Sequence, residues 1–240
     1  MTGRAASGAG EHGDDAGSGG DSLLYRVADD LFHQLGDGAG DGQALPAARR
    51  LYEQRRGQVR QDEELWEPWT QAFLEWFAFE WEGAERSGPP ARRVLAAETD
   101  ERRAAALRAW LRSQRALVSL GRQRGGRIRV RDILRGGVFD VDEPRALHGV
   151  DAGDVAEVRL IGFEGHVRFG RTFLFHPTGT AEAIEERVGQ LRAQSRAPED
   201  VLDHIAAVRV RTDRYRHVDP VRLYRAATEE LPPDRDAAGE

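Results

Sequence analysis

The spacing of hydrophobic residues changes twice along this chain, and the changes limit the folds that it can adopt. In the first half, apolar residues recur every three or four positions, which is the spacing of helices with one buried face. Over 126–175 they alternate with polar residues, as in strands with one buried face. From Thr180 the helical spacing returns. The sequence therefore predicts an α+β fold in which a β-rich part separates two helical parts.

We place the predicted boundaries where the composition or the spacing changes. The predicted parts are a helical module over 22–118, a small antiparallel β-barrel over 119–177 and a C-terminal helical extension over 178–231. Residues 1–21 are rich in small and acidic residues and contain almost nothing large to bury, so we expect a disordered tail. Residues 232–240 are predicted to be a second polar tail.

The helical module contains four predicted helices. They cover 22–36, 46–57, 62–82 and a segment within 91–116. The third holds most of the aromatic residues of the helical module and has apolar side chains on most of its sides. We therefore expect it to be central and its aromatic residues to form the core. In the fourth, Leu107, Trp110, Leu111 and Val118 form an apolar stripe, and arginines share the opposite face.

The β-rich part contains short strands separated by glycine-bearing turns. The predicted strands are 126–134, 138–141, 155–162 and 167–175. Four or five strands of this length suggest an SH3-like or OB-like barrel, because closure removes the unpaired edges of a flat sheet. Further helices are expected from Thr180, around 199–209 and from Asp219–Pro220 onward.

Composition excludes several classes of chemistry. All 35 basic residues are Arg, and the chain contains no Cys. Without Lys there is no phosphate-loop lysine, no kinase ATP lysine and no Schiff base for pyridoxal phosphate. Without Cys there is no thiol catalysis, disulfide, thiolate zinc site or iron–sulfur cluster. The sequence shows neither a secretory leader nor an apolar run that could cross a membrane, so we expect a cytoplasmic protein. We also expect no cofactor.

Charge is strongly segregated along the chain. Residues 102–135 contain eleven Arg against one acidic residue, Asp132, whereas 62–82 contain seven acidic residues and no basic one. Arg127, Arg129 and Arg131 alternate along a predicted strand and would share one face of it. With Arg112, Arg115 and Arg135 they form the predicted binding face. Two alternatives remain: the face meets a partner, or the acidic helix compensates it within the same molecule.

Two further groups of residues are candidates for a site. His148, His166 and His176 lie in the predicted barrel and could join Asp140, Asp142 or Asp154 in a metal or acid–base site, although no metal-binding or catalytic spacing is present. The second group is basic and aromatic: Arg209, Arg211, Arg214, Arg216, Arg222 and Arg225, with Tyr215 and Tyr224. It is predicted to be either an interaction face or a helix that packs on the bundle.

One stretch resembles a known group of proteins. Phe73-Leu-Glu-Trp-Phe-Ala-Phe-Glu-Trp81, a charged helix, Ile128-Arg-Val-Arg-Asp-Ile-Leu134 and Gly153-Asp154 before a strand follow one another in this order. The pattern resembles a group of largely uncharacterised bacterial proteins, some of which carry a SEC-C zinc motif. The resemblance implies a helical module followed by a small barrel. The zinc ligands of that group are Cys, so no metal site is carried over to any residue of this chain.

The sequence as a whole favours a non-catalytic binding or adaptor protein that acts through charged surfaces. No catalytic or metal-ligating residue is predicted. An acidic protein is the favoured partner, because segregated charge most often serves recognition between proteins. The alternative is RNA or single-stranded DNA bound by the Arg-rich strand, since guanidinium groups neutralise phosphate and stack on bases. An enzyme that uses Asp and His of the barrel is the second alternative.

Overall fold

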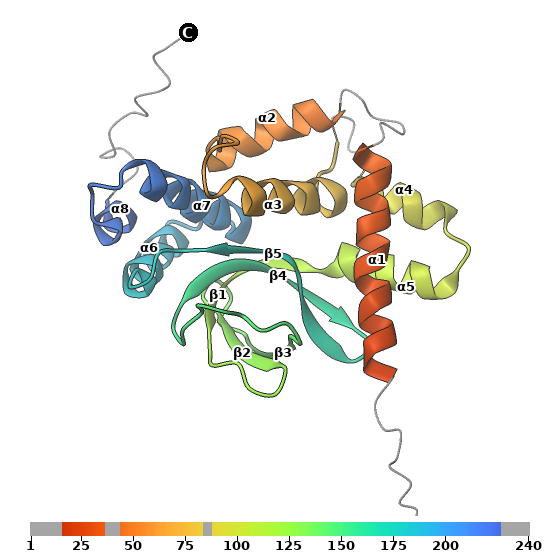
Figure 1. Ribbon diagram of the computed structural model, residues 1–240. Coiled ribbons are helices and arrows are strands. Elements are labelled where there is room, and N and C mark those ends of the chain that lie inside the picture. The colour runs from red at the N-terminus through yellow and green to blue at the C-terminus, as the bar shows by residue number, and fades with distance from the viewer. Residues whose placement is uncertain (1–15, 37–43, 84–87, 227–240) are drawn as a thin grey trace, which may run out of the picture.

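The computed structural model describes residues 16–36, 44–83 and 88–226, with side chains from residue 23 onward (Figure 1). The first helices are α1 (Ala16–Gly36), α2 (Ala44–Arg56), α3 (Trp66–Phe79), α4 (Pro90–Ala97) and α5 (Glu101–Arg112). The strands are β1 (Gln114–Leu120), β2 (Arg127–Asp132), β3 (Val138–Asp142), β4 (Val155–Phe163) and β5 (His166–Phe175). The chain continues with α6 (Ala181–Ala193), α7 (Pro198–Arg214) and α8 (Pro220–Arg225).

The α+β class and the C-terminal helices are confirmed. Part of the predicted N-terminal tail is not a tail, because α1 already begins at Ala16. Residues 1–15 and 232–240, the rest of the two predicted tails, lie outside the described residues.

The five strands close into a barrel in the order β1-β2-β3-β5-β4. Four of the pairings are antiparallel, but β3 and β5 run parallel, with Val141 opposite Val167. The predicted barrel was antiparallel throughout, and this detail is wrong for a geometric reason. Strand directions cannot alternate all the way round a closed ring of five, so one neighbouring pair must be parallel.

The first strand lies where the sequence predicted the end of a helix. Val118 belongs to β1, and its side chain lies in the barrel interior with those of Ala116 and Leu120. Leu117 points the other way and packs against the C-terminal helices. Because β1 is buried on both faces, its sequence does not alternate between apolar and polar residues. The barrel therefore begins before the predicted boundary at 119.

The segment predicted as one helix within 91–116 is two helices, α4 and α5. Glu98 ends α4, and the carboxylate of Asp100 accepts hydrogen bonds from the backbone N–H groups of Arg102 and Arg103 at the start of α5. An acidic side chain at this position is a favoured start for a helix.

Helices cover one side of the barrel and leave the β2–β3 ribbon open (Figure 1). The side chains of β4 that point out of the barrel contact helices at both ends of the strand. Val155 packs against the C-terminal helices, and Ile161 and Phe163 pack against α1 and α5. In β2, by contrast, every second residue is exposed.

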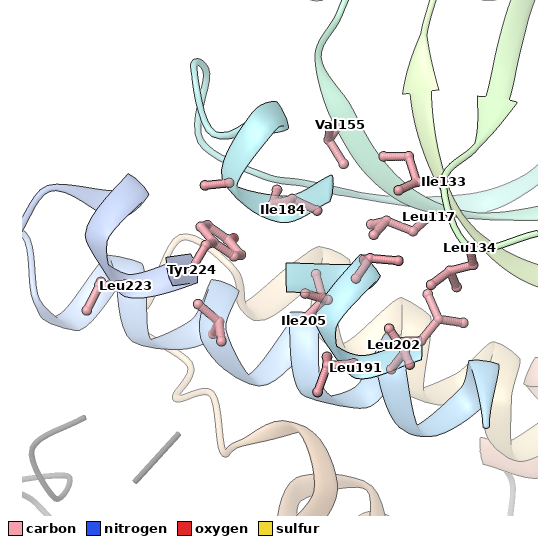
Figure 2. Close-up of a cluster of buried hydrophobic side chains, with 14 of the residues drawn as sticks. Leu117, Ile133, Leu134, Val155, Ile184, Leu191, Leu202, Ile205, Leu223 and Tyr224 are labelled. Atoms are coloured by element: carbon pink, nitrogen blue, oxygen red, sulfur yellow. The ribbon is translucent and has the colours of Figure 1, made fainter. Parts of the chain in front are cut away.

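The aromatic residues of α3 form the core of the helical part, as predicted. Trp69, Phe73 and Phe77 are buried and pack with Tyr52 of α2 and Val210 of α7. A second cluster joins the C-terminal helices to the end of the barrel, where Leu117, Ile133 and Val155 meet side chains of α6, α7 and α8 (Figure 2). Within the described residues, none of the helices combines the length and apolar character that a bilayer crossing requires.

Candidate functional site

Most of the predicted binding face is compensated within the molecule. Three of its exposed members pair with carboxylates of other elements: Arg127 with Asp142 at 3.0 Å, Arg131 with Glu185 at 2.6 Å and Arg135 with Glu199 at 3.2 Å. The carboxylates come from β3, α6 and α7 and not from the acidic segment 62–82, which was the predicted source of compensation. The outer face of β2 therefore carries both signs of charge.

Arg129 and Arg112 complete the exposed part of that face, and they lie apart. Arg129 is opposite Asp140 in the β2–β3 register. Arg112 lies at the end of α5 and lines a separate groove with Glu101 and Glu164. Neither arginine forms an ion pair within the part of the chain that the structure describes. The six predicted residues thus do not make one continuous cationic surface.

Arg115 corrects the prediction most clearly, because its side chain is buried. It lies on the outer face of β1, which helices cover, and its Nε is 3.0 Å from an oxygen of Glu80. Its Nη1 lies 3.3 Å from Asp203 and 3.6 Å from Glu157. A guanidinium enclosed in this way cannot be presented to a partner.

Arg115 belongs to a buried ionic cluster, a set of seven charged side chains between the barrel and the helices. The cluster consists of Arg56, Glu75, Glu80, Arg115, Glu157, Arg159 and Asp203. Two of its acids, Glu75 and Glu80, come from the acidic segment 62–82. The acidic segment therefore compensates Arg115, as predicted, but not Arg127, Arg131 or Arg135.

The pKa values of two acids in the buried ionic cluster shift in opposite directions. Burial raises the pKa of Glu75 above its usual value, although Arg159 and the backbone N–H of Arg171 oppose the change. Burial would also raise the pKa of Glu80, but Arg159 and Arg115 hold it below its usual value. The cluster joins α2, α3 and α7 to β1 and β4.

The histidines predicted as an alternative site lie in different environments. The Nδ1 of His166 is 2.5 Å from Asp142, at the surface of the barrel. His176 is buried, with its Nδ1 2.7 Å from the hydroxyl of Tyr224. His148 lies in the exposed connection between β3 and β4. Among the described residues, no group of three His, Asp or Glu side chains is arranged to hold a metal ion.

A concave site lined by four arginines lies between α2 and α7. We call this site the arginine cleft; it encloses about 450 Å³. Its lining comes from the end of α2, the α6–α7 connection and one face of α7: Gln54, Arg55, Gly57, Arg196, Asp200, Asp203, His204, Ala207, Val210, Arg211 and Arg214. The α7 residues recur every three or four positions, which places them on one side of the helix.

The arginine cleft has a surplus of positive charge. Its lining contains four arginines and two aspartates, and one of these, Asp203, is already held by two buried guanidinium groups at 3.0 and 3.3 Å. Arg214 donates to Glu63 at 3.1 Å. Arg196 and Arg211 have no carboxylate at ion-pair distance among the residues that the structure places. Two guanidinium groups therefore face the cleft uncompensated.

The pKa of His204, in the cleft wall, is affected by this positive charge as well as by burial. Its Nε2 accepts a hydrogen bond from Nε of Arg187 at 3.1 Å. Burial, followed by the charges of Arg187, Arg196 and Arg211, lowers the pKa of His204 to about 4. His204 is therefore neutral near pH 7, and a bound anion would offset the charges that depress its pKa.

The sequence predicted this site only in part. Arg211 and Arg214 belong to the basic segment that was singled out as a second interaction face, and that segment does pack on the rest of the molecule. Arg55 and Arg196 were not predicted, because they come from distant parts of the chain. In the sequence, only the spacing of polar residues along 200–214 indicated that this side of the helix could line a site.

Comparison with known proteins adds no relative: no family model, curated protein or solved structure matches this chain. The resemblance to the proteins with a SEC-C motif therefore stays a prediction.

Proposed function

We propose that this chain is a non-catalytic binding protein that recognises an acidic protein segment, and that the arginine cleft is its binding site. The observation that carries the proposal is the presence of two uncompensated guanidinium groups, Arg196 and Arg211, in a cleft of about 450 Å³. Cavities of this size are typical of ligand sites. Guanidinium groups bind carboxylates through charge-assisted, often bidentate hydrogen bonds.

The chemistry of the lining supports binding over catalysis. Guanidinium groups stay protonated and cannot serve as bases. The carboxylate of Asp203 is held by Arg56 and Arg115, and the Nε2 of His204 already accepts a hydrogen bond from Arg187. The lining contains no Ser, Thr, Tyr or Cys that could act as a nucleophile. These groups can orient and neutralise an anion, which is what a binding site requires.

A different observation favours nucleic-acid binding as a second candidate function. Arg122 and Arg124 are exposed in the turn between β1 and β2, close in the chain to Arg129, and none of the three forms an ion pair within the described ranges. However, Asp140 lies opposite Arg129, and the sequence has no aromatic residue between Trp110 and Phe139. Single-stranded nucleic acid is usually held by aromatic stacking as well as by charge. The cleft is therefore the better-supported site.

The experiment compares the two sites with two probes. Fluorescein-labelled octaglutamate and a single-stranded RNA of eight nucleotides are titrated by anisotropy at about 50 mM salt, where charge-dependent binding is strong. We expect Arg211→Gln to weaken octaglutamate binding about tenfold, because one charge-assisted hydrogen bond contributes roughly 1.5–3 kcal/mol. Arg122→Gln removes an exposed arginine outside the cleft and is the matched control.

A second readout is independent of affinity. Octaglutamate should raise the pKa of His204 from about 4, measured by NMR of its ring, because the peptide offsets the neighbouring guanidinium charges. If Arg211→Gln and Arg122→Gln weaken peptide binding equally, the cleft is not the site. RNA binding that depends on Arg122 alone would instead support the second candidate function.

A further inference from the structure

A second concave site adjoins the arginine cleft. We call it the basic hollow; it encloses about 270 Å³. Its lining comes from the β2–β3 connection, the end of α6, the α6–α7 connection and the start of α7: Leu134, Arg135, Arg192, Arg196, Pro198 and Val201. Leu134 and Val201 are buried and belong to the apolar cluster drawn in Figure 2. The basic hollow therefore has an apolar floor and a cationic rim.

Arg196 lines both sites, so the basic hollow and the arginine cleft are neighbours on one surface. Arg192 lies in the last turn of α6, and Arg196 follows four residues later in the α6–α7 connection. Neither arginine meets a carboxylate at ion-pair distance in the described part of the chain, whereas Arg135 is held by Glu199 at 3.2 Å. Uncompensated positive charge thus continues from Arg211 through Arg196 to Arg192.

Like charges in such a row repel one another. The repulsion adds to the effect of burial on two neighbouring side chains. Burial and then Arg196 lower the pKa of Arg187, and burial and then several arginines lower that of His204. A ligand that places negative charge along the whole row would relieve the repulsion, whereas one small anion would neutralise only part of it.

From this row we infer that the ligand is an extended acidic peptide whose carboxylates occupy the arginine cleft and the basic hollow together. The inference rests on the proposed function and names its ligand. An extended peptide advances about 3.3 Å per residue, so several acidic residues can follow a row of separated arginines. No aromatic side chain lines either site, and aromatic stacking is the usual complement of charge in single-strand binding.

The test measures how affinity grows with peptide length. Labelled diglutamate and octaglutamate are titrated against the full chain and against Arg192→Gln, which changes the basic hollow alone. We expect octaglutamate to bind at least about tenfold more tightly than diglutamate, because linked sites add their contributions. Arg192→Gln should remove most of this gain and leave diglutamate affinity within about twofold. Arg122→Gln, outside both sites, should preserve the gain.

The outcomes separate the inference from the proposed function. If the gain with length survives Arg192→Gln while Arg211→Gln still weakens binding, the extended ligand is wrong and the proposed function stands. If Arg211→Gln behaves like Arg122→Gln, the proposed function itself fails. An RNA of eight nucleotides that binds more tightly than octaglutamate, with the same dependence on Arg192 and Arg211, would replace the peptide with nucleic acid. Thermal unfolding of each variant checks that it is folded.

Discussion

Replacing Arg56 by Met tests whether the buried ionic cluster stabilises the fold. Arg56 is completely buried, and its guanidinium lies 2.6 Å from Glu157 and 3.0 Å from Asp203. Removing one partner of a buried ion pair leaves an uncompensated charge and typically costs about 3–5 kcal/mol. Arg115 still contacts both acids, so we expect a loss near the lower end, about 3 kcal/mol.

The measurement is urea unfolding followed by tryptophan fluorescence. The midpoint should fall with an unchanged slope, because the fold and the surface exposed on unfolding are the same. Arg55→Met is the control: Arg55 is the next residue of α2, its side chain is 51% exposed, and it lies 3.9 Å from Asp203. An exposed contact of this kind contributes at most about 1 kcal/mol. In the double variant Arg56→Met/Glu157→Gln, part of the lost stability should return, since one orphaned charge is removed. Equal effects of Arg56→Met and Arg55→Met would show that the buried ionic cluster does not stabilise the fold.

Substitutions at Gly170 and His176 test the packing of the barrel and the effect of pH on stability. In Gly170→Ala, the new Cβ would lie 2.9 Å from Cβ of Arg159, so we expect about 1–3 kcal/mol of destabilisation by thermal unfolding. Gly162→Ala, with no atom within 4 Å, should be close to neutral, and equal effects would contradict this account. Burial lowers the pKa of His176 to about 3, so the unfolded chain takes up a proton first and stability falls as the pH drops from about 6.5 towards 3. As the pH is lowered across that range, the urea midpoint should fall less for His176→Gln than for the unchanged chain. The same fall in both would exclude the histidine as the cause.

The arrangement of β1 and β4 explains why the arginine-rich segment of the sequence does not form one positively charged surface. Each strand places apolar side chains in the barrel and sends charged ones outward, where the helices cover them. Arg115 and Arg159 therefore meet Glu80 inside the molecule. An arginine-rich segment can thus be divided between the interior and the surface by the packing of elements that lie elsewhere in the chain.

The amino-acid sequence alone predicts the α+β class, the barrel and the place of α3 in the core. These features depend on local spacing: Ile128 and Val130 alternate with arginines, and the aromatic residues of α3 recur on several sides of one helix. Alternation reports a strand that is buried on one face, and it is present in any sequence that forms one.

Only the packing of the folded chain sets the position of β1, the parallel pairing of β3 with β5, and the place of the arginine cleft. A strand buried on both faces carries no alternation, and the direction of a pairing depends on how many strands close the ring. The arginine cleft joins Arg55, Arg196 and Arg211 from three separate segments. Whether such charges meet a carboxylate or an open cleft depends on how helices pack, and local spacing in the chain does not contain that information.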